Sequence, residues 1–206
     1  MTTETERHLR ADAARNAERI LRAAREVYAD VGPEAPLDEI ARRAGVGTRT
    51  LYRRFPNKEE LVRAVLEQSF AEDLTPAIER ALNDDDPRNG LVTLLEAMLS
   101  MVDRDRNTLA AANNSGALTT EISAPLLDSL TLLTRRGQQA GLIRADLVPE
   151  DTHRILGMLV SVLWSTAPRA DGWRRYVALV LDALSPEGAT PLPPLTPFVR
   201  GDNCLM

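Results

Sequence analysis

Apolar residues recur at intervals of three and four along most of the chain. This spacing places them on one face of an α-helix. It predicts helices near residues 7–31, 37–44, 48–55, 57–82, 89–104, 106–118, 122–140, 150–167 and 171–185. No segment alternates convincingly with period two, so we assign no sheet. The pattern therefore predicts an all-α protein of about nine helices.

Several helix boundaries have local signals. Pro36 suits the first position of the second helix, and Gly45 is expected to end that helix. Asn57 is a good N-cap for the fourth, with Glu60 three positions later as in a capping box. Because a proline inside a helix removes a backbone donor, Pro76 predicts a kink or a break within residues 57–82.

The second and third predicted helices form a helix-turn-helix arrangement, because a turn of about three residues containing Gly45 joins them. At 100° per residue, Leu51 and Phe55 fall on one side of the third helix. Arg49, Thr50 and Arg53 fall on the opposite side. We expect the apolar side to be buried in a head core made of Ile40, Val46, Leu51 and Phe55.

The outward side chains of this third helix are of types that recognise DNA. Arginine can pair with guanine, threonine can contact a base or a methyl group, and tyrosine can contact a phosphate. Lys58 lies in the first turn of the next helix, where backbone N–H groups also favour a phosphate. The candidate DNA-binding residues are Gly47, Thr48, Arg49, Thr50, Tyr52, Arg53 and Lys58. Alternatively, they form only the solvated face of an amphipathic helix.

The net charge of −5 and the pI of about 5.2 argue against DNA binding until the charge is mapped. Residues 7–58 hold 12 Lys or Arg and 7 Asp or Glu, whereas residues 71–206 hold 12 and 18. A polyanion would therefore meet the N-terminal third. Arginines of the first helix, including Arg19 and Arg25, alternate with acids, and we expect most to be solvated or paired with them.

Composition predicts a protein that remains in the cytoplasm. Hydrophobic residues make up 44% of the chain, but no run approaches a membrane span, and the N-terminus is polar. The last 22 residues hold five prolines and are expected to form a mobile tail, although Leu192, Leu195 and Phe198 could dock on the body. We divide the chain into a DNA-binding domain (1–56), a helical effector-binding and dimerisation domain (57–185) and the proline-rich tail (186–206).

Enzymatic and metal chemistry find little support in the sequence. The two histidines, His8 and His153, and the single Cys204 provide neither a Cys/His pair nor a zinc site. The acidic run at 83–87 is better explained as a solvated loop, and His153 as a residue at a helix start beside capping acids. We therefore expect no enzyme activity, no cofactor and no metal.

The segments ILRAAREVYADVG and LDEIARRAGVGTRTLYRRFPNKEEL resemble the first four helices of the TetR family of bacterial transcriptional regulators, over roughly residues 17–66. The matching positions are Ile40, Ala41, Ala44, Gly45, Val46, Thr50, Leu51, Tyr52, Phe55, Lys58, Glu59 and Leu61. Two departures stand out. Ala35 and Pro36 replace the usual Thr or Ser at the second helix, and Arg49 replaces a small residue, so we expect its side chain to contact DNA.

The resemblance implies a helix-turn-helix head followed by a helical ligand-binding and dimerisation domain. It implies a homodimer on a near-palindromic operator and, most simply, a repressor released by a small, fairly apolar effector. The candidate pocket residues are Met98, Met101, Asn113, Asn114, Leu130 and Trp164. The alternative function is a helical protein that binds a small molecule or partner and carries a degenerate DNA-binding head.

Apolar seams in the last two helices give the candidate dimer interface. Its residues are Ile155, Met158, Leu159, Val162, Leu163, Tyr176, Val177, Val180, Leu181 and Leu184. The same faces could instead pack within one subunit, and periodicity alone does not separate these two arrangements.

Overall fold

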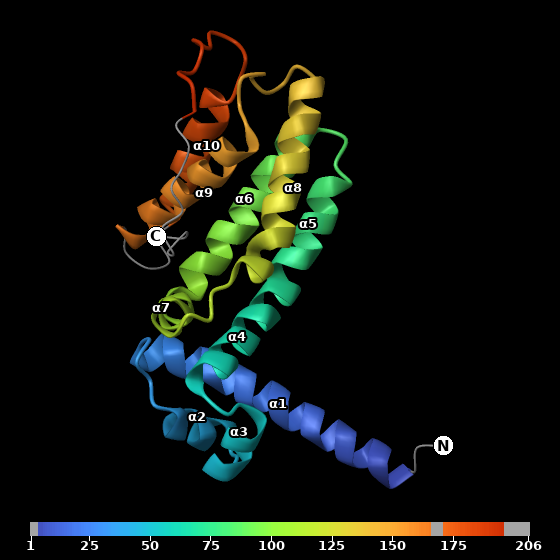
Figure 1. The fold of residues 1–206 in the computed structure, drawn as a ribbon, viewed down its shortest axis with the longest axis vertical. Coiled ribbons are helices and arrows are strands. Elements are labelled where there is room, and N and C mark those ends of the chain that lie inside the picture. The colour runs from blue at the N-terminus through green and yellow to red at the C-terminus, as the bar shows by residue number, and fades with distance from the viewer. Residues whose placement is uncertain (1–3, 166–170, 196–206) are drawn as a thin grey trace. The chain divides into compact units, whose positions relative to one another are not determined.

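The computed structural model describes residues 4–165 and 171–195, and within these ranges every regular element is helical (Figure 1). Ten α-helices and one π-helical segment occur there. The predicted all-α class is confirmed. None of the described helices is both long enough and apolar enough to cross a membrane.

Packing divides the chain into two compact units. Unit 1 comprises residues 1–70 and 105–122, and unit 2 comprises residues 71–104 and 123–206. The predicted DNA-binding domain, residues 1–56, falls inside unit 1. The predicted domain boundaries stay predictions, because they concern function rather than packing.

Unit 1 contains the helix-turn-helix and its support. Its helices are α1 (Glu4–Val31), α2 (Leu37–Ala44), α3 (Thr48–Arg54), α4 (Lys58–Ser69) and α7 (Arg106–Ser115). α2 packs on α1, α3 follows α2, and α4 and α7 pack on each other and on α1. One apolar core joins the five helices, with Ile20, Val27, Tyr28, Ile40, Leu51, Leu61, Leu66 and Ala111 among its buried residues. One buried core therefore joins α2 and α3 to α1, α4 and α7.

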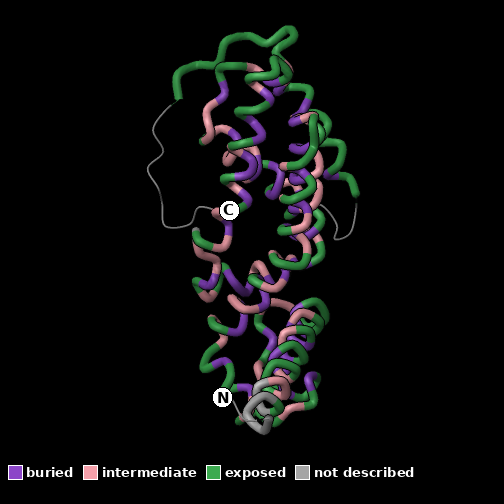
Figure 2. Tube along the Cα trace, turned by 90° about the vertical axis from the view of Figure 1, so that its right-hand side faces the viewer, coloured by how far each residue is buried: buried purple, intermediate pink, exposed green. Residues whose placement is uncertain are grey.

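Unit 2 is built around α6 (Pro87–Arg104), which packs against α5 (Thr75–Leu82), α9 (Pro149–Trp164) and α10 (Trp173–Ala183). α8 (Thr120–Gln139) runs through the same unit after residue 122. Buried positions recur along the helices at the intervals expected of amphipathic segments (Figure 2). The largest fully buried side chains here include Trp173, Leu91, Leu94, Leu99 and Met101.

The kink or break predicted within residues 57–82 is confirmed, and the structure has three segments there. α4 ends at Ser69, a π-helical turn covers Phe70–Leu74, and α5 starts at Thr75. Pro76 lies in the first turn of α5, where the N–H that it lacks is not needed. The proline thus marks the start of a new helix, and the irregular turn precedes it. The predicted cap at Asn57 is confirmed, since its Oδ1 accepts the Glu60 N–H at 2.8 Å.

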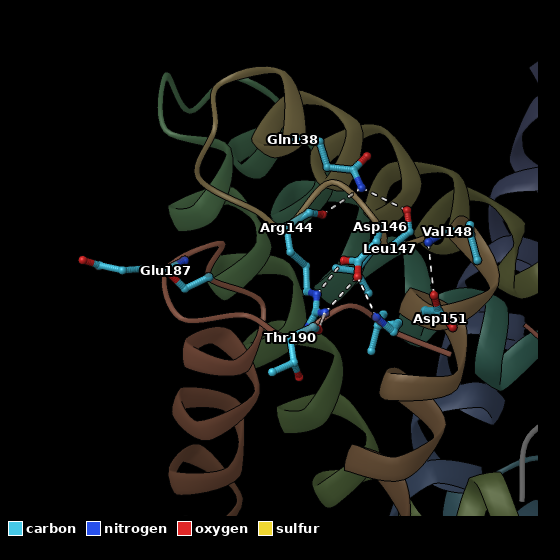
Figure 3. Close-up of polar contacts among 10 residues, drawn as sticks. Gln138, Arg144, Asp146, Leu147, Val148, Asp151, Glu187 and Thr190 are labelled. Atoms are coloured by element: carbon cyan, nitrogen blue, oxygen red, sulfur yellow. Dashed lines mark hydrogen bonds and ion pairs between the residues drawn. The ribbon is translucent and has the colours of Figure 1, made fainter. Parts of the chain in front are cut away.

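The start of the proline-rich segment is held by one ion pair (Figure 3). Arg144 Nε donates to Asp146 Oδ1 at 2.6 Å, and its Nη2 donates to the Thr190 carbonyl. Asp146 Oδ2 also accepts the Leu192 N–H at 2.9 Å. Leu192, which we considered able to dock, contacts Asp146 through its backbone, while its side chain is exposed. Residues 196–206, including Phe198 and Cys204, lie outside the described residues.

Candidate nucleic-acid interface

The turn between α2 and α3 is a glycine-ended helix cap. Gly45 has φ +65° and ψ +37°, a left-handed conformation that favours glycine. The Gly45 N–H donates to the Arg42 carbonyl at 3.2 Å, and the Val46 N–H donates to the Ala41 carbonyl at 3.0 Å. These paired hydrogen bonds close the last turn of α2. Gly47 is then the N-cap of α3, its carbonyl accepting the Thr50 N–H at 2.8 Å.

The two sides of α3 differ in exposure. Leu51 is fully buried, Phe55 just after the helix is 5% exposed, and Ile40 is fully buried opposite them. Val46 is half-buried and packs against the same core. Thr48, Arg49, Tyr52 and Arg53 are exposed, as is Gly47. Thr50, which we expected to face outward, is half-buried.

The cations of α3 differ from those of α2 in their partners. Arg42 pairs with Glu39, and Arg43 pairs with Asp30 at 3.0 Å. Within the described ranges, Arg49 and Arg53 form no ion pair. An unpaired guanidinium can bind a phosphate or a base without first losing a protein carboxylate. Of these two helices, α3 therefore offers more positive charge to a polyanion.

Arg54 was missed by the sequence analysis. It is exposed, and its guanidinium carbon lies 5.4 Å from the centroid of the Phe55 ring. The ring holds this cation at the C-terminal end of α3. The helical angles could have identified it, since Arg54 falls between Thr50 and Leu51 on the helix and is too polar to be buried.

Lys58 begins α4 with an acidic partner already in place. Its Nζ lies 3.1 Å from Glu34 Oε2, and Asn114 Nδ2 donates to Glu34 Oε1 at 2.9 Å. The Asn114 hydrogen bond and the Lys58 ammonium together hold the pKa of Glu34 below its usual value. A phosphate that binds Lys58 must therefore compete with a carboxylate. Sequence analysis could not foresee this, since the three residues are distant in the chain.

The six candidate pocket residues are not brought together in either unit. Met98, Met101 and Leu130 are buried in unit 2, but Trp164, at the end of α9, is 47% exposed. Asn113 and Asn114 are exposed on α7, which belongs to unit 1. The Asn114 side chain also donates a hydrogen bond to Glu34. In the described ranges no group of three His, Cys, Asp or Glu side chains could hold a metal ion.

The candidate dimer residues divide into two classes. Leu159, Leu163, Val177, Leu181 and Leu184 are buried within the subunit. Met158 is 60% exposed and Tyr176 is 43% exposed, while Ile155, Val162 and Val180 are half-buried. Leu179, which the sequence analysis omitted, is 53% exposed on the same side. An open apolar hollow is lined by Met158, Leu159, Val162, Tyr176, Leu179, Val180 and Ala183. We call this surface the α9–α10 face.

Known proteins resemble both the head and the whole chain. The model of the family "Bacterial regulatory proteins, tetR family" matches residues 20–65. An uncharacterised HTH-type transcriptional regulator of Mycobacterium tuberculosis is 30% identical over 167 residues, which is 78% of this chain and 84% of that protein. The HTH-type transcriptional activator FasR of Mycolicibacterium smegmatis is 40% identical over 88 residues, covering 42% of this chain and 40% of FasR.

A solved structure extends the likeness to the fold. The TetR transcription regulatory protein of Mycobacterium vanbaalenii is 32% identical, with a TM-score of 0.58, and the match covers 86% of this chain and 99% of that one. The matched head contains the buried core and the exposed α3 face described above. The chain therefore belongs to the TetR family of DNA-binding transcriptional regulators, which are not enzymes.

Proposed function

We propose that this regulator is a homodimeric repressor that binds a near-palindromic operator through α3 and releases it when a small, fairly apolar effector binds in unit 2. The observation that carries the proposal is the exposed α3 face, where Arg49 and Arg53 have no carboxylate partner among the described residues. Guanidinium groups can form two parallel hydrogen bonds with guanine, so this face can distinguish sequences. Thr48 and Tyr52 flank it.

A second copy of the chain is the proposed partner of the α9–α10 face. Met158, Tyr176 and Leu179 together expose apolar side chains that a monomer would leave in water. Helices α9 and α10 pack on each other, so two copies related by a twofold axis would form a four-helix interface. Two identical heads would then recognise half-sites about 34–36 Å apart, or a multiple of this distance.

The class of effector is proposed from the buried polar residues of unit 2. Those described are hydroxyl-bearing: Ser123, Ser129, Thr134 and Thr152. No Lys, Arg, Asp or Glu side chain is buried in the described part of this unit. A charged ligand would need a buried charge of opposite sign, because desolvating an unpaired charge is costly. This supports an uncharged ligand held by apolar contacts and a few hydroxyl groups.

The proposal is tested by a gel-shift with DNA from upstream of the protein's own gene. We expect a discrete complex of one dimer per site that persists against excess non-specific DNA. A promoter fused to a reporter gives the sign of regulation, and expression is expected to fall when the protein is supplied. No shift by a folded dimer at low salt would refute DNA recognition, and increased expression would refute repression.

A further inference from the structure

Arg19 of α1 lies against the turn that precedes the recognition helix. Its Nη2 donates to the Ala44 carbonyl at 2.6 Å and lies 3.1 Å from the Gly45 carbonyl. Its Nη1 has one further contact, with Asn16 Oδ1 at 3.4 Å. We expected the arginines of α1 to be solvated or paired with neighbouring acids. Arg19 is instead bound to backbone oxygens of another helix.

These two carbonyls are natural acceptors for a cation. The last carbonyls of an α-helix have no donor within the helix and carry the negative end of its dipole. Ala44 ends α2, and Gly45 is its left-handed cap. A guanidinium satisfies such oxygens with two N–H groups in a fixed plane, which an ammonium cannot do. The positive charge of Arg19 thus stabilises the negative, C-terminal end of α2.

A side chain at position 45, besides straining the positive φ, would displace the Arg19 guanidinium. A Cβ at this position would lie 2.9 Å from Arg19 Nη2, closer than side-chain carbons normally approach. Because glycine has no side chain, the Arg19 guanidinium can approach the Gly45 carbonyl. The same turn contains the Val46 N–H bond to the Ala41 carbonyl and leads directly to Gly47, the N-cap of α3.

We propose that Arg19 is a positioning residue for DNA recognition. It fixes the α2–α3 turn against α1 and thereby sets the direction in which α3 presents Arg49 and Arg53. This inference rests on the proposed DNA recognition by α3. The competing role for a surface arginine in a DNA-binding head is direct contact with a phosphate. The two roles predict different effects on binding.

The test compares Arg19→Ala and Arg19→Lys with wild type. Arg15→Ala is the matched control, since Arg15 lies on the same helix and pairs with Asp12. The first readout needs no DNA. In Arg19→Ala, hydrogen exchange of the Gly45 and Val46 amides, which donate to the Arg42 and Ala41 carbonyls, should accelerate about three- to tenfold, while amides of α4 and α7 stay protected. Unchanged exchange at the turn would overturn the proposal, and the α4 and α7 amides report whether the head is still folded.

The second readout uses a duplex that the wild type selects from a random pool, together with an unrelated duplex. For Arg19→Ala we expect affinity for the selected duplex to fall about tenfold, with affinity for the unrelated duplex nearly unchanged. The slope of log K against log salt on the unrelated duplex should not change. Arg19→Lys should recover less than half of the affinity, because the rotatable, strongly hydrated ammonium of lysine does not present its N–H groups in the fixed plane of a guanidinium.

A phosphate contact would give the opposite result. Both duplexes would then bind more weakly to the same degree, the magnitude of the salt slope would fall by about 0.9, and lysine would restore binding. That result would overturn the proposal. If the wild type selected no duplex at all, the proposed DNA recognition would fail, and the exchange measurement would still decide whether Arg19 holds the turn.

Discussion

Lys58 and Asn114 donate hydrogen bonds to the two oxygens of one carboxylate, that of Glu34. Lys58 opens α4, whereas Asn114 is near the end of α7, and all three residues belong to unit 1. The predicted phosphate-binding lysine is therefore tied to a helix outside the helix-turn-helix. Its availability to DNA depends on a carboxylate that α7 helps to hold.

Replacing Glu34 by Gln should strengthen DNA binding. The change frees Lys58 and removes a negative charge, so we expect affinity to rise roughly two- to fivefold at low salt and less at high salt. Fluorescence anisotropy with a labelled duplex measures this. The control is the same substitution in a Lys58→Ala background. If the gain persists there in full, Lys58 is not the residue that Glu34 restrains.

Placing a charge on the α9–α10 face should separate the subunits. Met158→Asp or Leu179→Asp would bury an unpaired carboxylate at the proposed interface, weakening association by about 3 kcal/mol or more. Sedimentation equilibrium should then report a monomer of 22.7 kDa, where we expect the wild type to be a dimer. Leu142→Asp is the matched control, because Leu142 is a similarly exposed leucine outside both helices. Dimers formed by all three variants would assign the interface elsewhere.

Removing the Tyr28 hydroxyl should stabilise the fold. Tyr28 is fully buried, and its hydroxyl forms no hydrogen bond with the described residues. A buried hydroxyl without a partner costs roughly 1–3 kcal/mol, so Tyr28→Phe should raise the free energy of unfolding by about 1 kcal/mol in urea titrations. Tyr52→Phe, at an exposed position outside the α9–α10 face, should change stability little. A clear loss of stability in Tyr28→Phe would mean that this hydroxyl makes a favourable contact.

The same tyrosine gives the protein a specific alkaline sensitivity. Burial, and secondarily the Glu34 carboxylate, raise the pKa of Tyr28 to about 12. The unfolded pKa is about 10, so the stabilisation linked to this group is complete below pH 10 and is lost as pH rises through 12. Between these values the wild type should lose more stability than Tyr28→Phe. Parallel stability curves for the two proteins over this pH range would contradict the assignment.

Neutralising Asp146 should release the start of the proline-rich segment. In Asp146→Asn we expect faster exchange of the Leu192 amide and faster proteolysis within residues 186–195, because asparagine has one acceptor oxygen in place of two and no charge to pair with Arg144. Glu187→Gln is the control, since it removes a charge from the same segment. The Glu187 side chain points away from Arg144 and Asp146 in Figure 3. Equal proteolysis in both variants would mean that Asp146 does not hold the segment.

The acid dependence of the contacts made by Asp146 follows from the direction in which its pKa is shifted. The Arg144 guanidinium, with the Leu192 N–H, holds that pKa well below its usual value. A depressed folded pKa means that the contribution is complete above the unfolded value of about 3.9 and is lost only as pH falls through the folded value. Protection of the Leu192 amide, corrected for intrinsic exchange, should therefore persist from pH 7 to pH 4. Loss of protection near pH 6 would point to a different titrating group.

The sequence predicted the head of this protein well because its signals are local. Gly45 ends α2, Asn57 caps α4, and the spacing of Leu51 and Phe55 identifies the buried side of α3. Each of these depends on residues close together in the chain. Periodicity also located the helices of unit 2 to within a few residues.

What the sequence could not predict depends on interactions between distant residues. The Glu34 carboxylate joins Lys58 to Asn114, and Arg19 binds the carbonyls of Ala44 and Gly45, although no local pattern signals either interaction. Apolar periodicity also cannot distinguish a face buried in the subunit from one covered by a partner. Leu159 and Met158 are neighbours in sequence, yet the first is buried and the second is exposed.

The DNA-reading role of α3 is tested most directly by the affinity of Arg49→Ala/Arg53→Ala for the selected duplex, measured beside an unrelated duplex. We predict that affinity for the selected duplex falls by about 1–3 kcal/mol for each arginine that reads a base, while affinity for the unrelated duplex falls much less and the dimer persists. Arg42→Ala, which removes an arginine already paired with Glu39, should bind nearly as the wild type does. Undiminished affinity of the double variant for the selected duplex would contradict the assignment of α3 as the DNA-reading face.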